Sequence, residues 1–462
     1  NIILLLAVNL GFSQNWSDPV IISKFGSNHS PDFKIDKNGV IHCVWVHEIT
    51  SELYKIYYSK SINNGETWTE PIPITDNYCS YPQIVADTLG NLFVSYDYDI
   101  FQNPRICYVK FNIADSVWSQ QIILASGSYN RLVIDHTNRV YFFWFAGTEY
   151  YRYMDNNVLS SILSPSAGLT ERYYFEYCTI DKHNKIFCIG NRTAGSHSHG
   201  AYFTCFNNVW SSYFDLSNES FFESGISLKS SGFPSFVWLQ AEFDSVSYFT
   251  STYYAESLGD SVLTPVYLAP KTSYPAIVID LNDQPHIVES QEIDNEYQLI
   301  HRYFLNDAWQ NELLGRSKNK YLQNVLVSKL SCIYLVYNKL DTMINSATGS
   351  YFGLIGFRKL EITPGVVDHS SKSTVLLFPN PFSDKINFEF VNTNCKAFHL
   401  AIIDIYGHVV YRERFHCDSL MTNKFVWNGK NSFGEQVADG CYFLQISTGS
   451  EIIVKKIIRI SR

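Results

Sequence analysis

The 462-residue sequence has little charge, little methionine and no long apolar run in its interior. Charged residues make up 17% of it, below the roughly 25% usual for soluble domains. It contains 35 Lys and Arg residues against 44 Asp and Glu residues, and the basic residues form no block. Without a basic stretch to follow phosphates, nucleic acid is not an expected partner. Three Met residues and few Leu-rich or Ala-rich amphipathic runs argue against a helical protein.

Motifs for metals and cofactors are missing as well. The ten cysteines form no CxxC pair and no Cys/His group with zinc spacing, so we expect neither a metal nor a cofactor. Their density is also far below that of a disulfide scaffold. Cys178 and Cys188 lie at matching distances from a predicted tight turn. They are expected to face each other across a hairpin, either as a disulfide or as two buried thiols.

The first dozen residues, NIILLLAVNLGF, are mostly apolar. This is the length of the apolar region of a secretory signal, whereas a membrane span needs about 20 residues. We therefore expect residues 1–14 to belong to a signal peptide that is cleaved near Ser13 or Gln14. The alternative is a first β-strand. No other stretch predicts a transmembrane segment.

Aromatic residues are abundant, at 16% of the chain with 32 Tyr, 32 Phe and 9 Trp. Together with Val and Ile they favour β-sheet. Seven segments share an alternating strand, a turn and a second apolar strand that usually closes on an aromatic residue. The turn-opening positions recur every 46 to 51 residues, at Asp36, Asp87, Asp135, Asp181, Lys229, Asp280 and Ser328.

The composition of these turns explains the repeat. An Asp that opens a turn accepts hydrogen bonds from the backbone two residues on, and the Gly or Asn after it tolerates positive φ. A third strand and a turn ending in tryptophan follow in several units, at Trp118, Trp210 and Trp309. Four strands per unit, repeated seven times, predict a seven-bladed β-propeller over residues 15–361.

The third turn of the first unit, residues 61–68 (SINNGETW), carries a family resemblance. It resembles the Asp-box of sialidase-like, BNR-repeat propellers, with Asn63 where the family has Asp. The resemblance implies a self-bonded structural turn and supports the fold, not an activity.

The carboxy-terminal region has a different pattern. Residues 362–374 contain Pro, Gly and Ser without apolar periodicity, which predicts a linker. Residues 375–462 alternate short strands with Gly and Asn turns, which predicts a small Ig-like antiparallel β-sandwich. The expected fold class is therefore all-β, a seven-bladed propeller followed by this sandwich.

This region resembles the type A C-terminal sorting domain of the type IX secretion system, known from Bacteroidota-like bacteria. The matching residues include Pro379, Asn380, Pro381, Gly407, Gly440, Lys455 and Lys456. The resemblance implies export to the periplasm, passage through the outer membrane by the secretion machinery, and release or attachment at the cell surface. The alternative is an ordinary Ig-like adhesion domain with glycines at the same turns.

A ligand of a propeller usually meets the face built by loops that join one blade to the next and the second strand to the third. Near those loops the sequence places aromatic rings, carboxylates and a few arginines. Such groups suit a glycan, since rings stack on sugar C–H faces and carboxylates bind hydroxyls. The candidate ligand-binding residues are Tyr81, Asp97, Asp99, Tyr129, Arg131, Glu176, Tyr274 and Glu289.

This pattern leaves three kinds of catalytic site to consider. A sialidase needs three arginines around the substrate carboxylate, but the first unit contains no arginine. A different glycosidase needs two carboxylates at a spacing that sequence does not give. A third hypothesis is a polysaccharide lyase, because residues 192–200 (RTAGSHSHG) resemble a segment of some BNR-type propellers that include uronate-polymer lyases. The resemblance implies catalytic roles for His197, His199 and Arg192; the alternative is a mobile polar loop.

We therefore expect an exported propeller that binds an extracellular glycan, with non-catalytic binding favoured over catalysis. A carbohydrate-active lyase or glycosidase is the second hypothesis. A protein-binding adhesive scaffold is the third.

Overall fold

The structure is a computed structural model of the chain and divides into two compact units, Asn1–Pro364 and Gly365–Arg462. In the first unit it describes residues 16–362 apart from 24–25, 51–52, 77, 101, 167–170, 195–196, 212, 220, 244–247, 259–260, 306–307, 318–320, 330–331 and 345–350. In the second it describes 374–460 apart from 392–396, 405–408, 417–422, 433 and 449–451. The predicted signal peptide lies outside the described residues.

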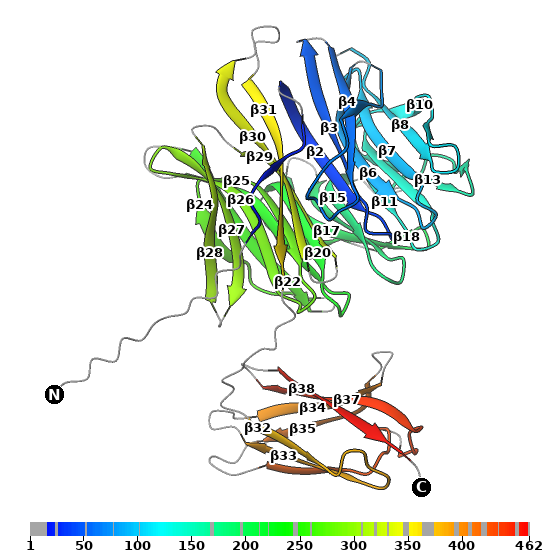
Figure 1. The fold of residues 1–462 in the computed structure, drawn as a ribbon, viewed down its shortest axis with the longest axis vertical. Helices are drawn as coiled ribbons and strands as arrows, with labels where there is room; N and C mark the ends of the chain where they lie inside the picture. Colours follow the sequence, from blue (N-terminus) through cyan, green and yellow to red (C-terminus); the bar gives the residue numbers. More distant parts are fainter. Residues whose placement is uncertain are drawn as a thin grey trace, which may run out of the picture. The chain divides into compact units, whose positions relative to one another are not determined.

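The first unit is a seven-bladed β-propeller, as the repeat predicted. Its antiparallel sheets are arranged around a common axis (Figure 1). The first three blades consist of β2 (Ser27–Ile35), β3 (Ile41–Thr50), β4 (Leu53–Ser61) and β5 (Ile72–Pro73); β6 (Cys79–Ala86), β7 (Leu92–Tyr98), β8 (Arg105–Asn112), β9 (Val117–Trp118) and β10 (Ile122–Ser126); and β11 (Ser128–Ile134), β12 (Val140–Phe145), β13 (Glu149–Asp155) and β14 (Val158–Leu159).

The next three blades continue the pattern. They consist of β15 (Arg172–Ile180), β16 (Ile186–Ala194), β17 (His197–Phe206), β18 (Val209–Trp210) and β19 (Phe214–Ser217); β20 (Phe221–Leu228), β21 (Pro234–Phe243), β22 (Tyr248–Leu258), β23 (Ser261–Val262) and β24 (Val266–Pro270); and β25 (Thr272–Ile279), β26 (Pro285–Ile293), β27 (Glu296–Leu305) and β28 (Ala308–Ser317).

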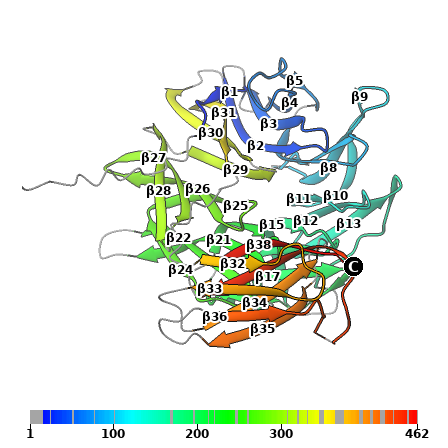
Figure 2. The same cartoon turned by 60° about the horizontal axis from the view of Figure 1, so that its bottom comes forward.

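The seventh blade closes the ring with both ends of the propeller sequence. It consists of β29 (Tyr321–Lys329), β30 (Cys332–Ile344), β31 (Tyr351–Glu361) and β1 (Val20–Ile21). The amino-terminal strand β1 pairs with β31 as the outermost strand, and Figure 2 shows the two side by side. The inner strands β2, β6, β11, β15, β20, β25 and β29 each contact the next, and β29 contacts β2.

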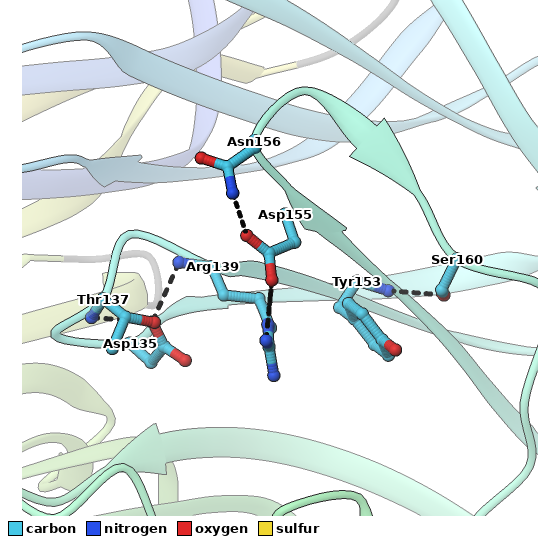
Figure 3. A network of polar contacts seen from close by, with 7 residues as sticks. All are labelled: Asp135, Thr137, Arg139, Tyr153, Asp155, Asn156 and Ser160. Atoms are coloured by element: carbon cyan, nitrogen blue, oxygen red, sulfur yellow. Dashed lines mark hydrogen bonds and ion pairs between the residues drawn. The ribbon is translucent and has the colours of Figure 1, made fainter.

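The first hairpin of five blades is closed by one aspartate used in the same way. In blade 3, Asp135 Oδ1 accepts hydrogen bonds from the backbone N–H groups of Thr137 and Arg139, at 2.9 and 2.8 Å (Figure 3). The Arg139 side chain then reaches Asp155 on β13, with Nη2 2.7 Å from Oδ2. The same backbone bonds are made by Asp36, Asp87, Asp181 and Asp280. The turn mechanism predicted from the repeat is therefore present at these five positions.

The core of the propeller consists of apolar layers between neighbouring blades, one for each of the seven junctions. The aromatic residue that closes the second strand is buried in these layers, as Trp45, Trp144 and Trp238 show, each 1% exposed. Because each blade contributes to two layers, the sheets are held together by burial of apolar surface on both faces.

The second unit contains a three-stranded and a four-stranded antiparallel sheet, an Ig-like sandwich around buried Trp427 and Phe388. The strand orders are β32 (Thr374–Phe378), β33 (Ile386–Val391), β36 (Asn423–Trp427), and β35 (Val409–His416), β34 (Ala397–Asp404), β37 (Gly440–Thr448), β38 (Ile452–Arg459). Across both units, the described residues contain no helix long and apolar enough to cross a membrane.

The sorting-signal residues fall at the edges of this sandwich. Pro379, Asn380 and Pro381 are exposed, and Asn380 Oδ1 accepts a hydrogen bond of 2.9 Å from the backbone N–H of Ile458 in the last strand. Gly440 begins β37 with φ +156°, which suits glycine. Lys455 and Lys456 lie in β38, opposite Leu444 and Phe443, and Lys455 is exposed. Gly407 lies outside the described residues.

Candidate ligand site at the propeller axis

Every inner strand of the propeller has a bulge or register shift a few residues before its hairpin turn. In five blades the residue six positions before the turn-opening residue has a left-handed backbone. These residues are Ser30 (φ 53°), Tyr81 (51°), Tyr129 (60°), Glu223 (46°) and Tyr274 (53°). The bulge thus places an equivalent side chain at the same position of the inner strand in each of these five blades.

Three of these five side chains are tyrosines, which we call the axial collar: Tyr81, Tyr129 and Tyr274. Tyr81 and Tyr129 are 44% and 47% exposed, and Tyr274 is half-buried. A bulky residue at positive φ is strained, whereas Gly or Asn adopts this conformation readily. Backbone strain of this kind is concentrated at functional sites, so the collar is a candidate ligand site.

Carboxylates of the preceding blade hold two of the three collar tyrosines in place. The backbone N–H of Tyr129 donates to Asp97 Oδ2 at 2.7 Å, and that of Tyr274 donates to Glu223 Oε2 at 2.5 Å. Since Asp97 is in blade 2 and Glu223 in blade 5, each bond joins a collar tyrosine to the blade before it. Both tyrosines are therefore fixed at the backbone while the rings stay accessible.

The same kind of clamp occurs at three further junctions. Asp32 Oδ2 accepts from the Ile84 backbone at 2.7 Å, Glu149 Oε2 accepts from Phe175 at 3.2 Å, and Glu176 Oε2 accepts from Ser224 at 2.7 Å. The five carboxylates therefore connect blades 1 to 6 in sequence. Asp97 and Glu176 were predicted as ligand-binding residues, but these carboxylate oxygens accept hydrogen bonds from the neighbouring blade.

Side chains from blades that are not neighbours influence each other electrostatically. The pKa of Tyr274 rises to about 12 through burial, then through nearby Glu223 and Tyr81. Burial also raises the pKa of Tyr177, with a further contribution from Asp32. Tyr274 and Tyr81 belong to blades 6 and 2, and Tyr177 and Asp32 to blades 4 and 1. Such pairs can approach only across the axis, so the site is surrounded by several blades.

Three axial carboxyl groups titrate near neutral pH. Burial raises the pKa of Asp32 and of Glu176 to about 7, and that of Glu149 to about 8, while hydrogen bonds from backbone N–H groups oppose this rise. Asp32 and Glu176 are half-buried, whereas Glu149 is inaccessible to solvent. A protonated carboxyl donates one hydrogen bond and accepts others, so Asp32 and Glu176 can bind an uncharged hydroxyl group.

The predicted cationic residue Arg131 lies among these acids. Its Nε donates to the backbone carbonyl of Glu176 in the next blade, and its Nη1 donates to the carbonyl of Asn130 at 2.7 Å. Its charge opposes the rise in pKa of Asp97, Glu149 and Glu176. Arg131 therefore joins two blades and brings positive charge to the axis.

The structure brings together Tyr81, Tyr129, Arg131, Glu176 and Tyr274, with Asp97 behind them. The remaining two predicted residues are elsewhere. Asp99 follows β7 near Tyr54, whose pKa it helps to raise, and its backbone N–H donates to the carbonyl of Tyr78 at 3.0 Å. Glu289 is buried in β26, where its Oε1 lies 2.5 Å from Arg302 Nε and its Oε2 accepts from Thr252.

The proposed lyase residues form a separate group in blade 4. Arg192 on β16 is the cross-strand partner of His199 on β17. Its guanidinium makes a bidentate bond to Asp215, at 2.9 and 3.1 Å, and lies 3.9 Å from the centroid of the Tyr213 ring. A substrate carboxylate would have to compete with Asp215. The backbone of His197 opposite Ala194 is described, but its side chain is not.

The predicted ligand-binding residues do not include Tyr177, Glu149 or Glu223, although Glu149 and Glu223 lie in loop segments that the sequence places at this face. Glu223 and the collar tyrosines share the sixth position before the repeat's turn, so aligning the repeats on that position would have found Glu223. Tyr177 and Glu149 carry no such signal, because their roles depend on the bulge and on the neighbouring blade. Among the described residues, no group of three or more His, Cys, Asp or Glu side chains could hold a metal ion.

Comparison with known proteins assigns the second unit. Residues 376–460 match the secretion system C-terminal sorting domain. The chain therefore carries a type IX sorting domain and is exported to the cell surface or secreted. No curated protein matches the sequence.

Solved structures match the propeller at low sequence identity. An ulvan lyase from a new polysaccharide lyase family, bound to a GlcA–Rha3S saccharide, is 12% identical, with a TM-score of 0.52 over 76% of this chain and 98% of its own. A protein of unknown function from Dyadobacter fermentans is 12% identical, with a TM-score of 0.45 over 74% and 98% of the two chains. At these identities the likeness concerns the fold alone.

Proposed function

We propose that this exported propeller binds an extracellular glycan through the axial collar. The observation that supports the proposal is the repeated use of tyrosine at a left-handed bulge position, in Tyr81, Tyr129 and Tyr274. Gly or Asn would adopt this backbone conformation with less strain. The presence of tyrosine at all three positions despite the strain indicates that the rings themselves have a function.

Glycan chemistry fits the groups around the collar. The face of a tyrosine ring stacks on the C–H face of a sugar, while the phenol hydroxyl reaches a polar partner. Burial raises the pKa of Asp32 and Glu176 to about 7, so each carboxyl group, when protonated, could donate a hydrogen bond to a sugar hydroxyl group and accept another from it. The ulvan lyase bound to a saccharide has the same fold, which agrees with a carbohydrate ligand.

A panel of neutral and uronate-containing polysaccharides tests this proposal. The full chain should be retarded by at least one polysaccharide in affinity electrophoresis. Loss of one stacking ring in Tyr129→Ala should weaken binding several-fold, because an aromatic contact contributes about 0.5–1.5 kcal/mol. Tyr267→Ala is the matched control, because Tyr267 lies on β24 and is 48% exposed, close to the 47% of Tyr129.

Equal weakening by Tyr129→Ala and Tyr267→Ala would contradict a site at the collar. Failure of every polysaccharide to retard the full chain would contradict a glycan ligand, and would favour the protein-binding scaffold.

A second function, catalysis on the bound glycan, is favoured by one specific arrangement. Tyr177 is within electrostatic range of both Asp32 and Arg131, and it is 39% exposed. Burial raises the pKa of Tyr177, so its hydroxyl stays protonated and can donate a proton to a bound substrate. Turnover would appear as ultraviolet absorbance from unsaturated sugar ends or as new reducing ends. Tyr177→Phe should then abolish turnover but not retention. Loss of turnover in Arg192→Ala with normal turnover in Tyr177→Phe would instead place catalysis at the Arg192–His199 pair on β16 and β17.

A further inference from the structure

Blade 4 places two cysteines directly opposite each other. Cys178 on β15 is the register partner of Cys188 on β16, and their Sγ atoms are 2.9 Å apart. Both side chains are buried, at 7% and 0% exposure. Other described cysteines, such as Cys43 and Cys107, have non-cysteine residues as their register partners.

The backbone already satisfies the main requirement for a bridge. Directly opposed residues of antiparallel strands have Cα atoms about 4.5–5.5 Å apart, within the range of about 4.4–6.8 Å that a disulfide needs. The two Sγ atoms are closer than the sum of two sulfur radii, so the thiols already point at each other. Only a small movement of the side chains would bring them to bonding distance.

The compartment supplies the remaining requirement. The sorting domain sends the chain through the periplasm to the cell surface or beyond, and disulfides persist in such oxidising environments. We propose that Cys178 and Cys188 are oxidised to a cross-strand disulfide during export.

The reaction is a thiol–disulfide exchange with a periplasmic thiol oxidase. One cysteine thiolate attacks the oxidant's disulfide and forms a mixed disulfide, and the second thiolate displaces the oxidant's thiol. Two S–H bonds and the oxidant's S–S bond are broken, and the Cys178–Cys188 bond is formed. The two protons and two electrons leave with the oxidant as two thiols.

The buried position of the pair sets the order of events. Cys188 packs with Phe143 and Tyr151 of blade 3, and burial raises the pKa of its thiol well above the usual value. The reactive thiolate is therefore suppressed once blade 4 has closed on blade 3. Oxidation precedes this closure, and the finished bond is then shielded from reductants.

The bridge would support the axial site. Cys178 follows Tyr177 directly, just after the bulge between Phe175 and Tyr177. A bond from Cys178 to β16 fixes the strand at the end of that bulge, and so fixes the register of Glu176 and Tyr177. The inference itself does not depend on what the axis binds.

A third thiol provides the control. Cys205 on β17 shares the same apolar layer, but its register partner is Ile186, so it is only a diagonal neighbour of Cys188. Diagonal neighbours lie about 7–8 Å apart, beyond disulfide reach. Cys205→Ser should therefore leave the proposed bond intact.

Peptide mass mapping of the full chain tests the proposal. The protein is collected after export, denatured, alkylated without reduction and digested. We expect a Cys178–Cys188 linked peptide and an intact mass lower by about 2 Da than that of reduced protein. Reductant added before denaturation should leave the bond intact, and the same reductant added after denaturation should cleave it.

Cys178→Ser should remove the linked peptide and make Cys188 available for alkylation. If that variant does not fold, the linked peptide in the wild-type protein and in Cys205→Ser still decides the question. Alkylation of both cysteines in the exported wild-type chain, or a Cys188–Cys205 peptide, would overturn the proposal.

Discussion

At the scale of single residues, the buried carboxylates of the axis act first as supports for the ring. Glu149 shows this best, because it is fully buried, its Oε2 accepts the Phe175 backbone N–H, and its Oε1 has no hydrogen-bond partner. Burial raises its pKa from 4.5 to about 8, so the folded protein holds a proton that the unfolded chain releases. Its stabilising contribution is therefore complete below about pH 4.5 and is lost as the pH rises towards 8.

Glu149→Gln should remove this loss, because the amide has the shape of the protonated acid and stays neutral. We expect the variant to unfold at a higher temperature than the wild type at pH 8, with little difference at pH 5. The gain should be at most a few kcal/mol, at about 1.4 kcal/mol per pKa unit. Thermal unfolding followed by circular dichroism at the two pH values measures it. A difference that does not change with pH would contradict a buried titrating Glu149.

A second prediction concerns Gly65 in the turn of residues 61–68. Gly65 has φ +86°, and a Cβ atom there would lie 2.0 Å from Cε1 of Phe357 in blade 7. Gly65→Ala therefore strains the backbone and displaces a buried ring, which should destabilise the protein by about 2–4 kcal/mol. Denaturant unfolding measures the loss. The matched control Gly39→Ala has a similar φ of +84° with open space around it, and it should cost less.

Residue roles at the axis were only partly predictable from the sequence. The sequence predicts Tyr81, Tyr129 and Tyr274 as ligand-binding residues because they lie in the segments just before three of the repeats. The carboxylates were assigned to the ligand, yet Asp97 and Glu176 accept backbone hydrogen bonds from the next blade. A carboxylate that binds a sugar and one that binds a backbone N–H look alike in sequence, because the partner is distant along the chain.

At the scale of elements, the amino-terminal segment completes blade 7 and caps a buried histidine pair. Trp16 Nε1 donates to His301 Nδ1 at 3.1 Å, and His301 Nε2 lies 2.9 Å from His286 Nδ1. His286 Nε2 in turn lies 3.5 Å from the Asp280 carboxylate, and the Glu312 carboxylate lies 3.3 Å from His301 Nδ1. This order of donors requires His301 to be neutral, with its proton on Nε2.

Burial and nearby His286 hold the pKa of His301 well below its usual 6.5. The unfolded chain therefore binds a proton that the folded chain excludes, and the contribution of His301 to stability is lost as the pH falls below about 6.5. Burial raises the pKa of Glu312, which lies beside His301. Burial also acts to raise the pKa of Asp280, but the neighbouring His286 and backbone N–H groups lower it overall.

His301→Gln isolates the contribution of His301 to the pH dependence of stability, because glutamine can still accept the hydrogen bond from Trp16 but does not titrate. We expect the variant to lose less stability than the wild type between pH 6.5 and 4.5, measured by denaturant unfolding at each pH. Tyr303→Phe, in the same stack of rings, is the control and should follow the wild type. A parallel pH dependence of His301→Gln and the wild type would contradict this account of the pair.

The seven repeated units were predictable from the sequence, but the strand β1, which completes blade 7, was not. The Asp turns of five units, and the aromatic residue that closes the second strand in most units, reveal the repeat because both depend on local chemistry. The strand β1 has two residues and pairs with β31, more than 300 residues away, so no local period marks it.

At the scale of the whole molecule, the chain combines a seven-bladed propeller with a sorting domain for export. Removal of Gly365–Arg462 should leave the propeller folded but hold it in the periplasm, because the sorting domain directs passage through the outer membrane. Cell fractionation of the full and shortened chains measures this, and circular dichroism of the shortened chain controls for folding. Equal amounts outside the cell would contradict an essential sorting role.

Binding of a glycan at the axis is the central claim, and an equilibrium titration tests it most directly. A saccharide from a polysaccharide that retards the full chain is titrated against the wild type, Tyr267→Ala, and the combined Tyr81→Ala, Tyr129→Ala and Tyr274→Ala variant. We expect Tyr267→Ala to match the wild type and the combined variant to bind at least roughly 10-fold more weakly, at about 1.4 kcal/mol per factor of ten. Unchanged affinity in a folded combined variant would contradict the account.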